Sequence, residues 1–260
     1  MKDKYNFVSR AASLALALIA AFAFNTRMSA QALPGSIWYN GDRNHTNGLA
    51  NERDDSLGFG LYNHVFDDFN VTDPTGWNVT SLYSNNYNNY IESGGTTTAV
   101  EWSIRQGITN GNGGTLIAGG TAGPGNFAFF FKDTGDFGFS EYTAQVLNLN
   151  IHLTPGTYFL NVTPVGNGFG RSFDSDTSGL NCVGTPCGNN GNAFFDSNFS
   201  GAHYQGPINT DFSMGVIGTV VPEPATVPLL ACGVAALLIA LRRRRGIGKR
   251  GRVSGKILTL

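Results

Sequence analysis

The chain has 260 residues, a formal net charge of −1 and charged residues at only 13% of its positions. The charge is unevenly spread, because residues 33–221 hold sixteen Asp and Glu but five Lys and Arg, a net of −11. So acidic a body excludes nucleic acid as a partner, since nothing offsets the repulsion from phosphates.

Residues 1–32 have the three-part layout of a secretory signal peptide. Lys2, Lys4 and Arg10 make the start basic, residues 11–24 form an apolar run without charge, and alanines stand at positions 30 and 32. The apolar run is too short to span a bilayer comfortably. We therefore predict that signal peptidase cleaves this segment and that the body of the protein is exported. A retained N-terminal anchor is the alternative.

The body, residues 33–220, contains a series of short apolar runs. Glycine is abundant, with 35 in the chain, and no helical periodicity lies between the runs. Short alternating runs joined by Gly- and Asn-rich turns are typical of antiparallel sandwiches. We predict an all-β ectodomain, an antiparallel jelly-roll-like β-sandwich, with strands at Ile37–Tyr39, Val65–Val71, Trp77–Tyr83, Ala99–Arg105, Thr115–Ala118, Phe127–Phe131, Leu147–Leu153, Tyr158–Val162 and Ser213–Val220.

Two of these predicted strands are joined by a distinctive turn. Leu147–Leu153 alternates strictly between apolar and polar residues, and Tyr158–Val162 alternates again. Between them, Pro155 and Gly156 are placed for a type II turn. Because type II turns splay strands more than the primed turns of tight hairpins do, we expect a corner that passes from one sheet to the other.

Aromatic residues suggest a carbohydrate contact. Tyr83, Tyr87 and Tyr90 stand among serines and asparagines. Exposed rings flanked by amides can stack on sugars and hydrogen-bond their hydroxyls. We predict a sugar contact here, with ordinary loop packing as an equal alternative, and we expect Trp77 and Trp102 in the core.

Carboxylates suggest a cation site. In the stretch DSDTSG, Asp174, Asp176 and Ser178 alternate, as ligands of a structural Ca²⁺ would. An EF-hand-type loop also needs an acidic ligand at its twelfth position, which is Thr185 here. A polar surface turn is therefore the favoured alternative. Asp67 and Asp68 are adjacent in a predicted strand. One of them must face inward and find a partner, such as Arg105, backbone amides or Ca²⁺.

The sequence provides little for catalysis. It has no Gly-x-Ser-x-Gly elbow and no His-Glu-x-x-His zinc motif, and its four histidines are scattered. With sixteen acids in the body, nothing marks one carboxylate pair as special. We therefore predict no catalytic residue and do not expect an enzyme.

Three cysteines are present. Cys182 and Cys187 bracket a short Gly- and Pro-containing segment, and we predict that they form a disulfide in an oxidising compartment. Cys232 lies in an apolar run and is expected to be a small hydrophobic residue there.

The C-terminal part places Pro222, Glu223 and Pro224 ahead of seventeen uncharged residues, 225–241. Four arginines come next: Arg242, Arg243, Arg244 and Arg245. A helix over the uncharged run covers about 25 Å, the lower limit for a membrane span. We predict a single transmembrane helix, with the arginines and a basic tail, residues 247–260, in the cytoplasm. A buried helix followed by a basic nucleic-acid-binding tail is the alternative.

The order of motif, apolar run and arginine cluster over residues 221–246 resembles the PEP-CTERM protein-sorting domain, also labelled the ice-binding protein C-terminal domain. The resemblance implies that an exosortase, a membrane-embedded transpeptidase, recognises Pro222, Glu223 and Pro224 in a bacterium with a Gram-negative envelope. Chains of this family usually end soon after the arginines, whereas this chain continues to Leu260. The body segments 65–71, 76–80, 101–105 and 153–160 resemble secreted bacterial β-sandwich proteins of uncharacterised activity.

Together these features predict a non-catalytic protein of the cell surface or extracellular matrix that contacts exopolysaccharide. Its partners would be signal peptidase, the exosortase and the inner membrane, which it would span once during sorting with the body outside. A polysaccharide-active enzyme of the glycoside hydrolase type and a calcium-stabilised adhesive module are the alternatives.

Overall fold

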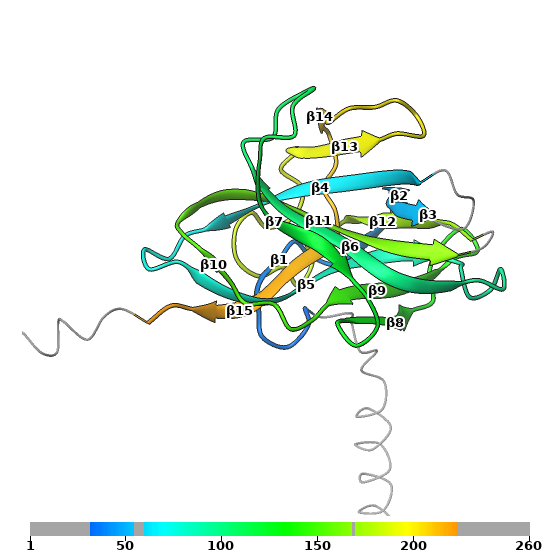
Figure 1. Cartoon of the computed structure of the whole chain (residues 1–260), viewed down its shortest axis with the longest axis horizontal. Helices are drawn as coiled ribbons and strands as arrows, with labels where there is room; N and C mark the ends of the chain where they lie inside the picture. Colours follow the sequence, from blue (N-terminus) through cyan, green and yellow to red (C-terminus); the bar gives the residue numbers. More distant parts are fainter. Residues whose placement is uncertain (1–31, 55–59, 168–169, 223–260) are drawn as a thin grey trace, which may run out of the picture. The chain divides into compact units, whose positions relative to one another are not determined.

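All regular structure in the described residues is β-strand, arranged in two sheets (Figure 1). The computed structural model describes residues 32–54, 60–167 and 170–222. This confirms an all-β body with the two sheets of a sandwich. Within these ranges no helix is long and apolar enough to cross a membrane. The predicted signal peptide before residue 32, the transmembrane run, the arginine cluster and the basic tail lie outside the described residues.

The eight-stranded sheet is built around β5 (Trp77–Asn88), which pairs with four other strands. β9 (Ser140–Val146) carries β8 (Phe127–Asp133) at its far side. The remaining strands of this sheet are β1 (Ser36–Tyr39), β2 (Arg43–Ala50), β10 (Ile151–Leu153), β12 (Ser172–Thr177) and β15 (Met214–Val220).

The seven-stranded sheet has the order β14-β13-β4-β3-β11-β6-β7, with a further pairing of β4 and β11. The short pairing of β3 with β11 is parallel, so the predicted antiparallel arrangement does not hold at this point. The strands are β3 (Glu52–Asp54), β4 (Leu61–Val71), β6 (Thr96–Gln106), β7 (Thr115–Ala122), β11 (Gly156–Asn167), β13 (Ala193–Ser197) and β14 (Gln205–Ile208).

The main core forms because the strands alternate between apolar and polar residues. On β6, Val100 and Ile104 are fully buried in this core, and Trp102 packs against it. Successive side chains of a strand point to opposite faces, so Glu101 and Arg105 are on the outer face of the sheet. The expected core positions of Trp77 and Trp102 are therefore confirmed, with Trp102 only partly buried.

The predicted corner between the sheets is confirmed. β10 pairs with β5 in the eight-stranded sheet, whereas β11 starts at Gly156 in the seven-stranded sheet. The prediction of a strand over all of Leu147–Leu153 was wrong, because regular pairing begins only at Ile151. Asn148 has a φ of 58°, a left-handed conformation that interrupts an extended chain.

A second, smaller core lies on the outer face of the seven-stranded sheet. Phe66 of β4, Phe159 of β11 and Phe194 of β13 point away from the main core and pack with Ile108 and Tyr204. Phe159 and Phe194 meet edge to face at 5.5 Å between ring centroids. These rings cover one part of the outer face, and the polar residues beside them form a hollow.

Candidate functional site

A hollow of about 160 Å³ lies over β4, β6 and β11 and is bordered by β7. Its polar lining consists of His64, Glu101, Ser103, Arg105 and Asn161. All five residues alternate with core residues on their strands, so they stand on the outer face of the seven-stranded sheet. We call this hollow the outer groove.

One wall of the outer groove is an ion-paired carboxylate. Glu101 Oε2 lies 3.1 Å from Arg53 Nη1 and 3.4 Å from His64 Nε2. Burial by itself raises the pKa of Glu101, but the hydrogen bonds and charges of His64 and Arg53 outweigh it, and the pKa lies below its ordinary value. The imidazole of His64 is stacked on the ring of Tyr62, with centroids 4.4 Å apart. Glu101 is thus an ionised acceptor held in a fixed position.

The opposite wall is a cation over an aromatic ring. The guanidinium carbon of Arg105 lies 5.5 Å from the ring centroid of Tyr204, and Arg105 Nη1 donates a 3.0 Å hydrogen bond to Gly113 O. Within the described part of the chain, this is the one hydrogen bond that the guanidinium makes. Tyr204 also packs against Phe66, with ring centroids 5.4 Å apart, which joins this wall to the small core.

The apolar side chains of the lining are the exposed Leu116 and the buried Phe66 and Tyr204, whereas the side chain of Trp102 packs against the main core on the other face of β6. On β7, Gly119 and Gly120 add no side chains, and a Cβ at Gly119 would lie 3.2 Å from Ser103 Cβ. The outer groove therefore offers the aliphatic surface of Leu116 next to a carboxylate, a guanidinium and a hydroxyl. Such a combination binds a ligand that is itself part apolar and part hydrogen-bonding.

Sequence reasoning did not name this site, although a signal for it exists. The period-two pattern of 99–105 places Glu101, Ser103 and Arg105 on one face of a strand. The pattern leaves open whether that face is covered by another part of the chain. The contributions of His64 and Tyr204 come from distant segments and have no local signal.

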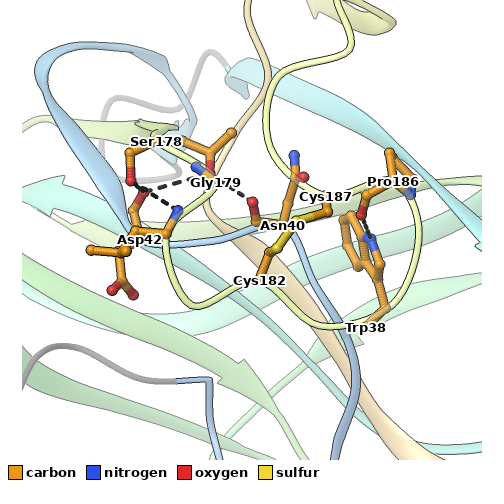
Figure 2. The surroundings of a disulfide bond; sticks show 10 residues. Trp38, Asn40, Asp42, Ser178, Gly179, Cys182, Pro186 and Cys187 are labelled. Atoms are coloured by element: carbon orange, nitrogen blue, oxygen red, sulfur yellow. Dashed lines mark hydrogen bonds between the residues drawn. A yellow bond between two sulfur atoms is a disulfide. The ribbon is translucent and has the colours of Figure 1, made fainter.

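The predicted disulfide between Cys182 and Cys187 is confirmed, with Cα atoms 5.4 Å apart (Figure 2). It closes a loop that lies along β1. Trp38 Nε1 donates to Pro186 O at 3.1 Å, and Gly188 N donates to Asn40 O at 3.2 Å. The loop therefore covers one end of the main core.

The predicted calcium-binding turn does not have the local structure of a turn. Asp174 and Asp176 belong to β12 and are buried, and Ser178 Oγ donates to Asp42 O at 2.8 Å (Figure 2). The favoured alternative, a polar surface turn, was wrong for the same reason. Among the described residues no group of three or more His, Cys, Asp or Glu side chains is arranged to hold a metal ion.

The predicted sugar-contacting tyrosines are buried. Tyr83, Tyr87 and Tyr90 are only 1–2% exposed, so their rings are not available for stacking on a ligand, and the predicted contact is wrong at this place. β5 continues to Asn88 as the central strand of its sheet, where a loop was expected. Burial raises the pKa of Tyr83 to about 12, and its hydroxyl lies 2.9 Å from Ser36 Oγ. The alternative, ordinary loop packing, holds for Tyr90, which follows β5, but not for Tyr83 and Tyr87, which are buried within the strand.

Of the predicted sorting residues, Pro222 is the last one that the structure describes, two residues after the end of β15. Glu223, Pro224 and the arginines Arg242–Arg245 lie outside the described residues. No family model, curated protein or solved structure matches the chain.

Proposed function

We propose that this protein is exported and sorted to the cell surface or extracellular matrix, where its β-sandwich makes non-catalytic contact with exopolysaccharide. The observation that carries the proposal is the order of segments around the sandwich. The last strand of the described residues ends at Val220, and the sequence continues with Pro222-Glu223-Pro224, an uncharged run and four arginines. A basic start and an apolar run precede the sandwich.

Two features of the body support a location outside the cytoplasm. Disulfides persist mainly in oxidising compartments, and the chain has one between Cys182 and Cys187. The loop around it is held by hydrogen bonds with Trp38 and Asn40. The net charge of −11 over residues 33–221 favours solubility in the extracellular medium and disfavours adhesion to anionic lipid. The jelly-roll-like form of the sandwich remains part of the proposal, and the crossing from β10 to β11 supports it.

Sorting is tested by replacing Pro222, Glu223 and Pro224 together by alanine in a host that has an exosortase. An epitope tag after Leu260 detects the C-terminal fragment that exosortase cleavage would remove. An antibody against the body detects the other fragment. In the unaltered chain the body should reach the surface or medium without the tag. In the triple variant both signals should stay together in the inner membrane, because the enzyme no longer recognises the segment.

The matched control replaces Thr219 and Val220, which lie just before the motif, by alanine, and it should be processed normally. Recovery of the full-length chain in the cytosol, with its first residues intact, would contradict export. Normal release of the triple variant would contradict recognition of the motif.

A polysaccharide-active enzyme is a second candidate, because the ionised Glu101 lines a hollow beside His64. Glycoside hydrolysis commonly uses a pair of carboxyl groups, and Glu101 is the one acid among the described residues that line the outer groove, which is why the non-catalytic role comes first. Release of reducing ends from a polysaccharide, lost in Glu101→Gln, would favour this candidate over the non-catalytic role.

A further inference from the structure

We propose that the outer groove binds one uncharged pyranose unit of a polysaccharide, with the rest of the polymer outside it. This inference rests on the proposed contact with exopolysaccharide and names its place and its chemistry. It also transfers the sugar contact from the buried Tyr83, Tyr87 and Tyr90 to the opposite sheet.

The size of the outer groove limits the ligand. Pockets for drug-sized molecules usually enclose about 300–1,000 Å³. At about 160 Å³ the outer groove is smaller, and it is open toward solvent on the sheet face. It therefore holds a single ring of a longer molecule and leaves exits for neighbouring units. A free small metabolite would be less enclosed here than small molecules normally are in their binding pockets.

The lining of the outer groove matches the two sides of a pyranose. A sugar ring has a C–H face that packs on apolar surface, and here the exposed side chain of Leu116 provides that surface. Its rim carries hydroxyls that both donate and accept. Glu101 supplies an ionised acceptor, and Arg105 supplies N–H donors, of which one is used by Gly113 O.

The charge of the protein determines whether a neutral or an acidic sugar unit is favoured. The carboxylate of Glu101 lies in the wall of the outer groove, and the surrounding body carries a net charge of −11. An anionic polymer such as a polyuronate is repelled at long range by this net charge. Arg53 is paired with Glu101, and the guanidinium of Arg105 does not offset the net charge of the body. An uncharged unit avoids the repulsion and can still use Glu101, Ser103 and Arg105 in the lining.

The test measures binding of uncharged oligosaccharides to the purified full chain. The chain is kept in a zwitterionic detergent without a sugar headgroup, since a glycoside detergent would compete. The probes are gluco-, manno-, galacto- and xylo-oligosaccharides and, as the acidic comparison, an oligogalacturonate of equal length. Ser103→Trp fills the outer groove, and Arg105→Met removes the donors but keeps an unbranched side chain.

The matched controls are Thr115→Trp, on an exposed position of β7, and Arg171→Met, which removes an arginine that pairs with Glu52; neither residue lines the outer groove. We expect at least one uncharged oligosaccharide to bind at millimolar concentration or below. Ser103→Trp and Arg105→Met should weaken it by about tenfold or more, as the loss of one charge-assisted contact would, while both controls bind normally. Melting curves show whether each variant is folded.

Three results would overturn the inference: no binding of any uncharged probe to the folded chain, unchanged binding in folded Ser103→Trp, or tighter binding of the oligogalacturonate. Its failure is separable from that of the proposed function. A chain that is sorted to the surface but binds no sugar refutes the inference alone, whereas a cytosolic chain refutes the proposed function whatever it binds.

Discussion

At the scale of single residues, Asp67 and Asp174 are fully buried acids. Asp67 points inward from β4, and its carboxylate accepts hydrogen bonds from Asn40 Nδ2, Phe212 N and Asp68 N at 2.7–2.9 Å. Because side chains alternate along a strand, either Asp67 or Asp68 is expected to face inward. Its partner there would be backbone amides, Arg105 or Ca²⁺. Asp67 takes this place, and its partners are two backbone amides and an asparagine.

Asp174 is less well satisfied than Asp67. Its Oδ2 accepts one hydrogen bond of 3.3 Å from Asn51, and its Oδ1 has no hydrogen-bond partner among the described residues. Burial, followed by the charge of Asp67, raises the pKa of Asp174 well above its ordinary value. Burial, followed by the charge of Asp211, does the same for the pKa of Asp67. Both acids therefore hold their protons more tightly in the folded chain than in the unfolded chain.

The consequence is a stability that falls as the pH rises. For a carboxyl with a raised folded-state pKa, the stabilising contribution is complete below the unfolded pKa, here 3.8, and is lost as the pH rises through the folded value. Asp174→Asn replaces this buried carboxyl by an amide that does not ionise. It should raise the free energy of unfolding by about 1–3 kcal/mol at neutral pH and flatten this dependence.

Chemical denaturation of the variant at about pH 5 and about pH 8 checks this prediction. Asp67→Asn is the matched control. It should destabilise the protein, because both carboxylate oxygens of Asp67 accept hydrogen bonds from N–H groups. The side-chain amide of asparagine has only one oxygen, so its NH₂ group would face one of these donors. Equal effects of the two variants would show that burial alone, and not the unmatched oxygen of Asp174, sets the pH dependence.

At the scale of elements, buried tyrosines lie on glycines of neighbouring segments. Tyr83 of β5 covers Gly215 of β15, Tyr90 covers Gly166 of β11, and a Cβ at either glycine would overlap the ring. This explains why tyrosines among serines and asparagines are buried. The facing glycines leave room for the rings, and they come from distant parts of the chain, beyond the reach of any local pattern.

Gly215→Ala should therefore destabilise the protein by about 1–3 kcal/mol, as overpacking of a core commonly does. Gly123→Ala is the control, since a Cβ there would meet nothing within 4 Å. Urea denaturation of both variants measures the difference. A Gly215→Ala protein as stable as the control would mean that the Tyr83 ring moves aside at no cost.

At the scale of the whole molecule, the two sheets are joined by a polar residue where the chain crosses between them. Asn51 stands between β2 of one sheet and β3 of the other and is fully buried. Its Nδ2 donates to Asn86 Oδ1 in the eight-stranded sheet at 3.0 Å and to Val162 O in the seven-stranded sheet at 2.8 Å. Thr163 Oγ1 donates to its Oδ1 at 2.6 Å.

Asn51→Ala should lower the free energy of unfolding by about 2–4 kcal/mol, because it leaves several buried groups of both sheets without partners. Asn150→Ala, at an exposed position, is the control and should be within about 0.5 kcal/mol of the unaltered chain. Thermal and urea unfolding check both. A small effect of Asn51→Ala would mean that water replaces the amide between the sheets.

The sequence by itself determined where most strands lie, which residues of each strand share a face, and that a corner joins β10 to β11. These features depend on the alternation of apolar and polar residues along a strand and on the residues of turns. Both are local patterns that extend over a few positions of the sequence. Only the tertiary structure decided which faces are covered. Tyr83 and Glu101 both point away from the main core, yet one is buried and the other lines the outer groove. The difference comes from glycines and loops far along the chain, and no local pattern contains them.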